Sequence, residues 1–268
     1  MKTFARSLSQ LMPDWVVLPP ELIETFDWME DQGWLVTRGT ATPDAHSLRI
    51  YPAQHHHHPV ASHLAFGGTT LPYTEHWATP DPAIDNRIAE IAEISGDGGR
   101  AAIWLDDDGK QWFVHLGHDS VGVITDDPLV LLQFFAMGYP EPGYLPQTDV
   151  TPVQAFLDYH GVETLADFGP DEQPLLPTEF QEFLKERFAL TLPATAADLG
   201  IAAFPEYADT STKDPFAQWI NSVTPEPSEA DLAYELELMR TVESLDIQDD
   251  DSTDAIMSKI GSLFKSKD

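Results

Sequence analysis

The segment from residue 100 to residue 138 constrains the fold more than any other part of this sequence. Two strand-like runs, Arg100–Leu105 and Gln111–Leu116, flank Asp107-Asp108-Gly109, which is typical of a tight hairpin turn. Ser120–Ile124 predicts a third strand. Asp126 or Asp127 then caps an apolar helix that has Pro128 in its first turn and stops at Gly138. This order predicts a meander with a covering helix, and so an α+β fold with a mixed or antiparallel sheet.

The spacing of apolar residues predicts further helices and strands on both sides of this segment. Upstream, the sequence predicts a helix over 19–31, short strands over 34–38, 48–51 and 63–66, a long loop over 67–87 and an apolar, acidic segment over 88–94. Downstream, it predicts a mainly helical extension with helices over 152–159, 178–188, 215–223, 228–246 and 254–265. We therefore expect an α+β domain over 1–148, a helical extension packed on it over 149–225, and an acidic amphipathic helical tail over 226–268.

The charge balance excludes several classes of partner. The 268 residues contain 14 Lys and Arg against 45 Asp and Glu, which gives a net charge of −31. A chain with so few cations is a poor ligand for nucleic acids or anionic membranes, because both are bound by neutralising phosphates. The absence of cysteine excludes disulfides and thiol chemistry. With no signal-like or membrane-spanning apolar run, a cytoplasmic location is expected.

The negative charge is concentrated in one long span. Residues 111–184 hold no Lys or Arg across 74 positions, and they contain twelve Asp and Glu residues. A second acidic cluster lies between Asp246 and Asp254. Two interpretations fit this pattern: a solvated surface that keeps the protein soluble, or a negative face that attracts a cationic partner.

Residues 88–145 resemble the SUKH superfamily (SMI/KNR-like), which includes bacterial toxin-immunity proteins. The similarity consists of the GDG turn at 96–98, the strand AAIWLDDDGK at 101–110, the strand WFVHLG at 112–117 and the Asp-Pro-started helix LVLLQFFAMGYPEP at 129–142. The segment LPPELIETFDWMEDQGW at 18–34 is similar to the helix that leads this family. The resemblance covers roughly residues 15–145, and the 40–85 segment departs from the family pattern in its length and its His and Pro content.

The resemblance implies a binding protein without a cofactor or catalytic residues. Its expected partner is a cognate toxin domain, and a basic toxin such as a nuclease would suit an inhibitor with a charge of −31. Two alternatives remain open. One is an intracellular interaction or regulatory adaptor of the same fold, and the other is a metal-dependent hydrolase that uses the histidines at 55–58.

The candidate partner-binding residues follow the negative charge and the aromatic side chains. The acidic candidates lie at the hairpin tip, before the covering helix and in Pro-rich connections: Asp106, Asp107, Asp108, Asp126, Asp127, Glu141, Asp171 and Glu172. The aromatic candidates, Trp28 and Trp77, lie outside the apolar stripes and could anchor an interface. Helix capping is an equally good explanation for Asp126 and Asp127.

Two further patterns suggest chemistry only weakly. The run His55–His58 could place His56 and His58 on one face of a strand as metal ligands, but the adjacent Pro59 favours an exposed loop. His115, His118, Asp119 and Ser120 include the residue types of a hydrolytic triad, but no G-x-S-x-G nucleophile elbow surrounds Ser120. We therefore expect neither a metal site nor a catalytic site.

Overall fold

The predicted meander forms one side of a seven-stranded antiparallel sheet and includes one of its edge strands, and the sheet with its helices confirms the α+β class. The computed structural model describes residues 1–37, 45–56, 58, 60–69, 71–76, 80–169, 172–207, 209–225 and 240. Met1–Val223 form one compact unit and Thr224–Asp268 a second. The helices predicted over 228–246 and 254–265 lie outside the described residues, apart from Arg240.

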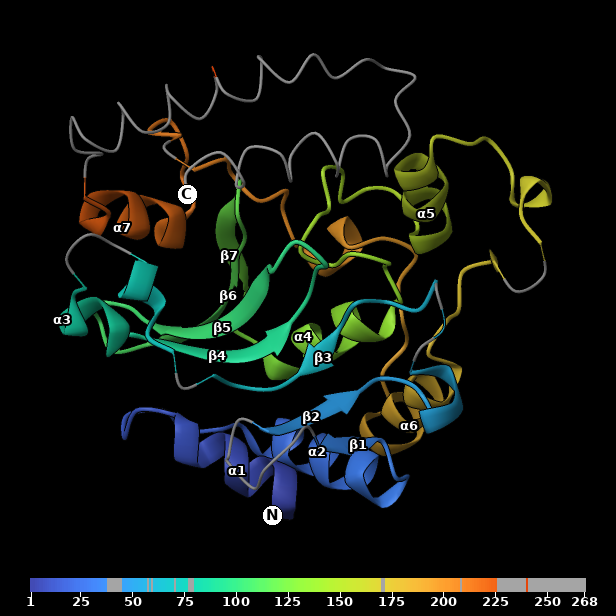
Figure 1. The fold of residues 1–268 in the computed structure, drawn as a ribbon, viewed down its shortest axis with the longest axis horizontal. Coiled ribbons are helices and arrows are strands. Elements are labelled where there is room, and N and C mark those ends of the chain that lie inside the picture. The colour runs from blue at the N-terminus through green and yellow to red at the C-terminus, as the bar shows by residue number, and fades with distance from the viewer. Residues whose placement is uncertain are drawn as a thin grey trace, which may run out of the picture. The chain divides into compact units, whose positions relative to one another are not determined.

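The strands follow one another in chain order, and each pairs with the next (Figure 1). Their bounds are β1 Leu35–Thr37, β2 His46–Arg49, β3 Ala65–Phe66, β4 Ile88–Glu93, β5 Arg100–Leu105, β6 Gln111–Leu116 and β7 Val121–Thr125. The helices are α1 Thr3–Leu11, α2 Pro20–Asp31, α3 Pro82–Asp85, α4 Pro128–Ala136, α5 Pro152–His160, α6 Thr178–Phe188 and α7 Pro215–Val223. Short 3-10 turns are η2 Ala53–His55, η3 Tyr73–His76, η4 Leu165–Asp167 and η6 Ala197–Leu199.

The β5–β6 hairpin depends on the side chain of Asp106. Its Oδ1 accepts hydrogen bonds from the backbone N–H groups of Asp108, at 3.0 Å, and Lys110, at 2.8 Å. Its Oδ2 accepts a third bond from the indole N–H of Trp112 at 2.8 Å. Gly109 completes the turn with a φ of 79°, a value that L side chains rarely adopt. Asp106 therefore fixes the turn rather than facing a partner.

Both faces of the central strands are buried against helices. On one face, Ala101, Ile103 and Phe113 belong to a large core that includes residues of α1, α2, α4 and α6. On the other face, Trp104 and Val114 belong to a smaller core shared with α3 and α7. This alternation follows from the two-residue period of a strand. In Figure 1, α1 and α2 lie next to β2, and α7 lies next to β7 at the other end of the sheet.

Asp214 joins the edge strand β7 to α7. Its Oδ2 accepts a hydrogen bond from the N–H of Val123 at 2.8 Å, and its Oδ1 accepts one from the N–H of Ala217 at the start of α7, also at 2.8 Å. The backbone of Pro205 also accepts a hydrogen bond from Val121, at 3.0 Å. These contacts cover an edge that would otherwise expose unpaired N–H groups.

Three sequence expectations need correction. The N-terminal residues 3–11 form α1, whose residues Phe4, Ala5 and Leu8 are buried, although no helix was predicted there. The loop predicted over 67–87 contains η3 and α3, and α3 begins because Asp81 accepts a hydrogen bond from the N–H of Ala83. Residues 88–93 form a strand, β4, whose alternation is interrupted by a shift in register between Glu90 and Ala92.

We predict that Asp106→Ala lowers the free energy of unfolding by about 1–3 kcal/mol, because it removes three hydrogen bonds to a carboxylate. Urea unfolding followed by tryptophan fluorescence measures this change. The control is Asp108→Ala, which alters an exposed carboxylate at the same tip and should change stability by less than about 0.5 kcal/mol. Equal losses in the two variants would contradict the role given to Asp106.

Candidate partner-binding surface

A cleft of about 640 Å³ lies between the segment after α4 and the helix α5. All of its lining residues fall between Tyr139 and Tyr159, inside the span that has no Lys or Arg. Two side chains on its wall, Tyr144 and Tyr159, are 60% and 58% exposed. The acidic groups on the wall are Glu141 and Asp158. The cleft therefore combines exposed aromatic rings with negative charge.

Hydrogen bonds within the chain position the residues that line this cleft. The buried hydroxyl of Tyr139 donates a hydrogen bond to the carbonyl of Val150 at 2.7 Å and accepts one from the N–H of Ala196 at 3.0 Å. Helix α5 begins at Thr151, whose hydroxyl accepts a hydrogen bond from the N–H of Gln154, and it ends at Gly161 in the left-handed conformation. Contacts within the chain thus position both Tyr139 and α5 beside the cleft.

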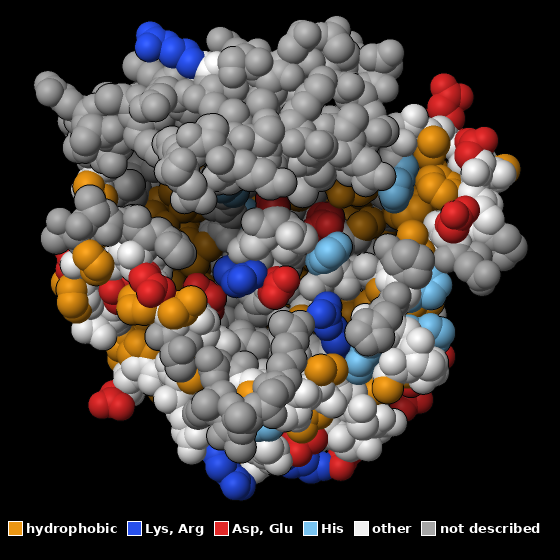
Figure 2. Space-filling model, in the orientation of Figure 1, with side chains coloured by type: hydrophobic (Ala, Val, Ile, Leu, Met, Phe, Trp, Pro, Cys, Tyr) orange, Lys and Arg blue, Asp and Glu red, His pale blue; other side chains and the backbone are white. Residues whose placement is uncertain are grey.

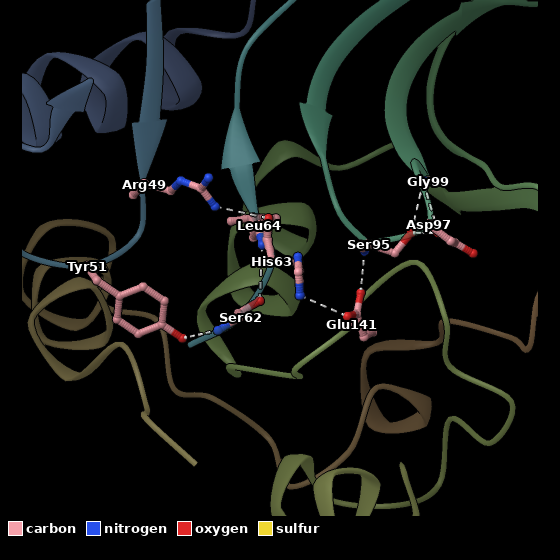
Figure 3. Close-up of polar contacts among 10 residues, drawn as sticks. Arg49, Tyr51, Ser62, His63, Leu64, Ser95, Asp97, Gly99 and Glu141 are labelled. Atoms are coloured by element: carbon pink, nitrogen blue, oxygen red, sulfur yellow. Dashed lines mark hydrogen bonds and ion pairs between the residues drawn. The ribbon is translucent and has the colours of Figure 1, made fainter. Parts of the chain in front are cut away.

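Glu141 is the predicted candidate that lies in this cleft. Its carboxylate accepts a hydrogen bond from the N–H of Gly96 at 2.8 Å and lies 3.2 Å from Nε2 of His63. Figure 3 shows it between His63 and the end of β4, near Ser95. Burial raises the pKa of Glu141, and the hydrogen bond from Gly96 and the nearby His63 oppose that change. Glu141 therefore mainly joins the Gly96 turn to His63, and only 12% of its side chain is exposed.

The segment that carries His63 is itself anchored. The N–H of His63 donates to the carbonyl of Pro140 at 2.9 Å. The buried hydroxyl of Tyr51 accepts a hydrogen bond from the N–H of Ser62 at 3.0 Å (Figure 3) and donates one to the carbonyl of Leu175 at 2.9 Å. The position of His63 beside Glu141 is consequently set by the backbone.

The other acidic candidates are spread over several elements. Asp107 is 86% exposed at the hairpin tip and pairs with Arg87 at 2.8 Å, and Asp108 is exposed beside it. Asp126 pairs with Lys110, and Asp127 caps α4 by accepting a hydrogen bond from Leu129 at 2.8 Å. Glu172 is exposed and accepts a hydrogen bond from Gly169, whereas Asp171 lies outside the described residues. Figure 2 agrees, because acidic side chains appear in small separate groups on the face it shows.

Trp28 packs against the core instead of standing outside it. Its ring stacks on Phe183 of α6 with a centroid distance of 4.2 Å and meets Trp34 edge-on at 4.9 Å. This contact joins α2 to α6, so Trp28 has a structural role. Trp77, the other aromatic candidate, lies outside the described residues.

None of the described residues of the histidine run lies in a strand. His55 ends η2, and Nε2 of His56 lies 2.8 Å from the carbonyl of Tyr51, so His56 and His58 do not present a shared strand face. His57 lies outside the described residues. Among the residues that the structure describes, no three His, Cys, Asp or Glu side chains are grouped as metal ligands would be.

His115 and Ser120 lie together inside the fold. Nε2 of His115 lies 3.2 Å from the Ser120 hydroxyl, and the imidazole, which is fully buried, stacks on Phe204 at 4.4 Å. His118 and Asp119 pair separately at 2.6 Å on the exposed turn. Burial lowers the pKa of His115 to about 4, although the nearby Asp97 opposes that change. A neutral, enclosed imidazole of this kind is part of the core.

The comparisons with known proteins give no relative. No protein-family model, no curated protein and no solved structure matches the chain. In the part of the chain that the structure describes, no helix has the length and apolar character needed to cross a membrane.

We predict that His115 makes the fold sensitive to acid. Its folded pKa of about 4 lies below the unfolded value of 6.5, so the unfolded chain takes up a proton first as the pH falls. The resulting loss begins near pH 6.5 and grows to about 3 kcal/mol near pH 4. Urea unfolding at several pH values should show this loss in the wild type.

The variant His115→Phe isolates the contribution of this group, because phenylalanine fills a similar volume and carries no titrating proton. Carboxyl groups other than Asp97, which interacts with His115, titrate alike in both proteins, so the difference between their pH profiles reports His115 and its coupling to Asp97. A difference that stays constant between pH 7 and pH 4 would contradict the assignment.

Proposed function

We propose that this chain is a non-catalytic immunity protein of the SUKH type, which neutralises a cognate basic toxin by binding it directly. The α+β fold agrees with the architecture that the sequence resemblance implies. The proposal assigns the protein a masking role, in which its surface covers the working face of the toxin. Nuclease toxins are the natural partners, because an enzyme that holds a polyanion needs a cationic surface.

The cleft between Tyr139 and Tyr159 is the observation that carries this proposal. It offers two largely exposed tyrosines beside the exposed Asp158 and the largely buried Glu141, and none of its described lining residues is Lys or Arg. Tyrosine supplies a large contact area at a low entropic cost, and aromatic residues concentrate the binding energy of interfaces. Carboxylates beside the rings would select a cationic partner and reject an anionic one.

The net charge of −31 supports the same conclusion through kinetics. Opposite charges on two proteins steer them together and raise association rates towards roughly 10⁸–10⁹ M⁻¹s⁻¹ at low salt. Rapid capture has value when the partner is toxic in small amounts. A surface that served solubility alone would not require an exposed aromatic cleft within its acidic span.

We predict that co-expression of this chain with the product of an adjacent toxin gene prevents killing and gives a stable complex. Tyr144→Ala combined with Tyr159→Ala should weaken that complex at least about tenfold, because both exposed rings leave the interface. Isothermal titration measures the affinity, and survival of the co-expressing cells provides a second readout.

The control carries Glu163→Gln and Asp167→Asn, which remove two exposed acidic groups that do not line the cleft. This control should keep its affinity within about threefold, since isolated surface charges contribute little. If the tyrosine variant binds and protects as well as the wild type, the cleft is not the docking surface. Complexes with several partners and no protection would indicate an adaptor of the same fold.

A further inference from the structure

A second hollow lies between the tip of the β5–β6 hairpin and α7, and it is lined by three tryptophans. Its volume is about 390 Å³, and Trp104, Trp112 and Trp219 contribute to its wall together with Asp106, Asp107 and Asp108. The pairing of β5 with β6 places Trp104 directly opposite Trp112. The ring of Trp219 lies 5.4 Å from that of Trp104. Indole rings and carboxylates thus converge on one space.

The rings around this hollow already attract cations of the chain itself. The guanidinium carbon of Arg87 lies 4.6 Å from the ring centre of Trp219, and Nζ of Lys110 lies 3.6 Å from that of Trp112. Arg87 also pairs with Asp107 at 2.8 Å. These contacts are cation–π interactions strengthened by a neighbouring carboxylate. They show which chemistry this part of the surface favours.

The hollow also has binding capacity that the described part of the chain leaves unused. The indole N–H of Trp104 is buried and has no hydrogen-bond partner, and Trp104 is only 3% exposed. Burial keeps this N–H out of reach of a ligand, so the capacity to bind one lies in the exposed carboxylates. The carboxylate of Asp107 stays 86% exposed despite its contact with Arg87, and Asp108 is exposed beside it.

We propose that this hollow binds an arginine side chain of a basic polypeptide. The guanidinium stacks on the partly exposed rings of Trp112 and Trp219 and pairs with Asp107 and Asp108. Arginine suits the site better than lysine, because its planar group both stacks on aromatic rings and pairs with carboxylates. The identity of the polypeptide as a toxin rests on the proposed function, but the binding chemistry does not.

The test uses the full chain and two short peptides, acetyl-Gly-Arg-Gly-amide and the same peptide with citrulline, which is neutral and similar in shape. Indole N–H resonances report binding, and Trp219→Phe identifies the resonance of Trp219. The arginine peptide should shift that resonance, and the citrulline peptide should not. Equal shifts with both peptides, or no shift with the arginine peptide, would overturn the proposal.

Variants at the hairpin tip separate this site from general charge attraction. Asp107→Asn with Asp108→Asn should weaken arginine-peptide binding by about fivefold or more, since two ion pairs are lost. The control with Glu163→Gln and Asp167→Asn removes the same charge elsewhere and should bind as the wild type does. Equal weakening in both variants would mean that net charge alone attracts the peptide, and would overturn the proposal.

The outcomes also distinguish this inference from the proposed function. If the chain binds the arginine peptide as expected but forms no complex with a toxin, the arginine site is supported and the immunity function is overturned. A chain that protects cells from a toxin but does not bind the peptide keeps the function, and the hollow is then not an arginine site.

Discussion

Strands β4–β7 have apolar side chains on both faces, and this requires helices on both sides of the sheet. An antiparallel sheet with one solvated face would alternate apolar and polar residues, but β5 has Ala101 and Ile103 on one face and Ala102 and Trp104 on the other, all buried. The segment after residue 148 supplies part of the cover. Phe180 of α6 completes the larger core, and Phe216 of α7 completes the smaller one. The helical extension is consequently an integral part of the sheet's packing.

This packing also determines where the two candidate binding surfaces lie. Helix α5 follows the core helix α4 and forms one wall of the cleft between Tyr139 and Tyr159. Helix α7 covers the other face of the sheet, and its Trp219 meets Trp104 at the tryptophan-lined hollow. Both surfaces place carboxylates beside aromatic rings. The two surfaces therefore combine negative charge with aromatic side chains, a combination that net charge alone does not provide.

Local signals in the sequence predicted the elements that have strong caps and turns. The hairpin around Asp107-Asp108-Gly109, the helix capped by Asp127 and the helix that begins at Pro20 all appear as expected. The sequence does not identify β4 as a strand, because the register shift between Glu90 and Ala92 breaks the alternation of apolar and polar residues. Helix α3 has only four residues, too few for a helical period to show in the sequence.

The candidate site could be predicted only in part. Glu141 was found from its charge, but Tyr144, Asp158 and Tyr159 were not, because their grouping depends on how α5 packs after the turn at Gly143. The sequence also could not show that Asp106 is occupied by three hydrogen bonds within its own turn, or that Trp28 is stacked on Phe183. Exposure and acidity identify candidates, but tertiary contacts decide which of them remain available.

Amide hydrogen exchange of the full chain, alone and mixed with the proposed basic toxin, tests the central claim most directly. Our account predicts slower exchange in the bound state across residues 141–160, which include α5 and the cleft. It predicts little change in α6, which carries Lys185 and Arg187 on exposed positions. Protection confined to α6, with none between residues 141 and 160, would contradict the assignment of the acidic, aromatic cleft as the partner-binding surface.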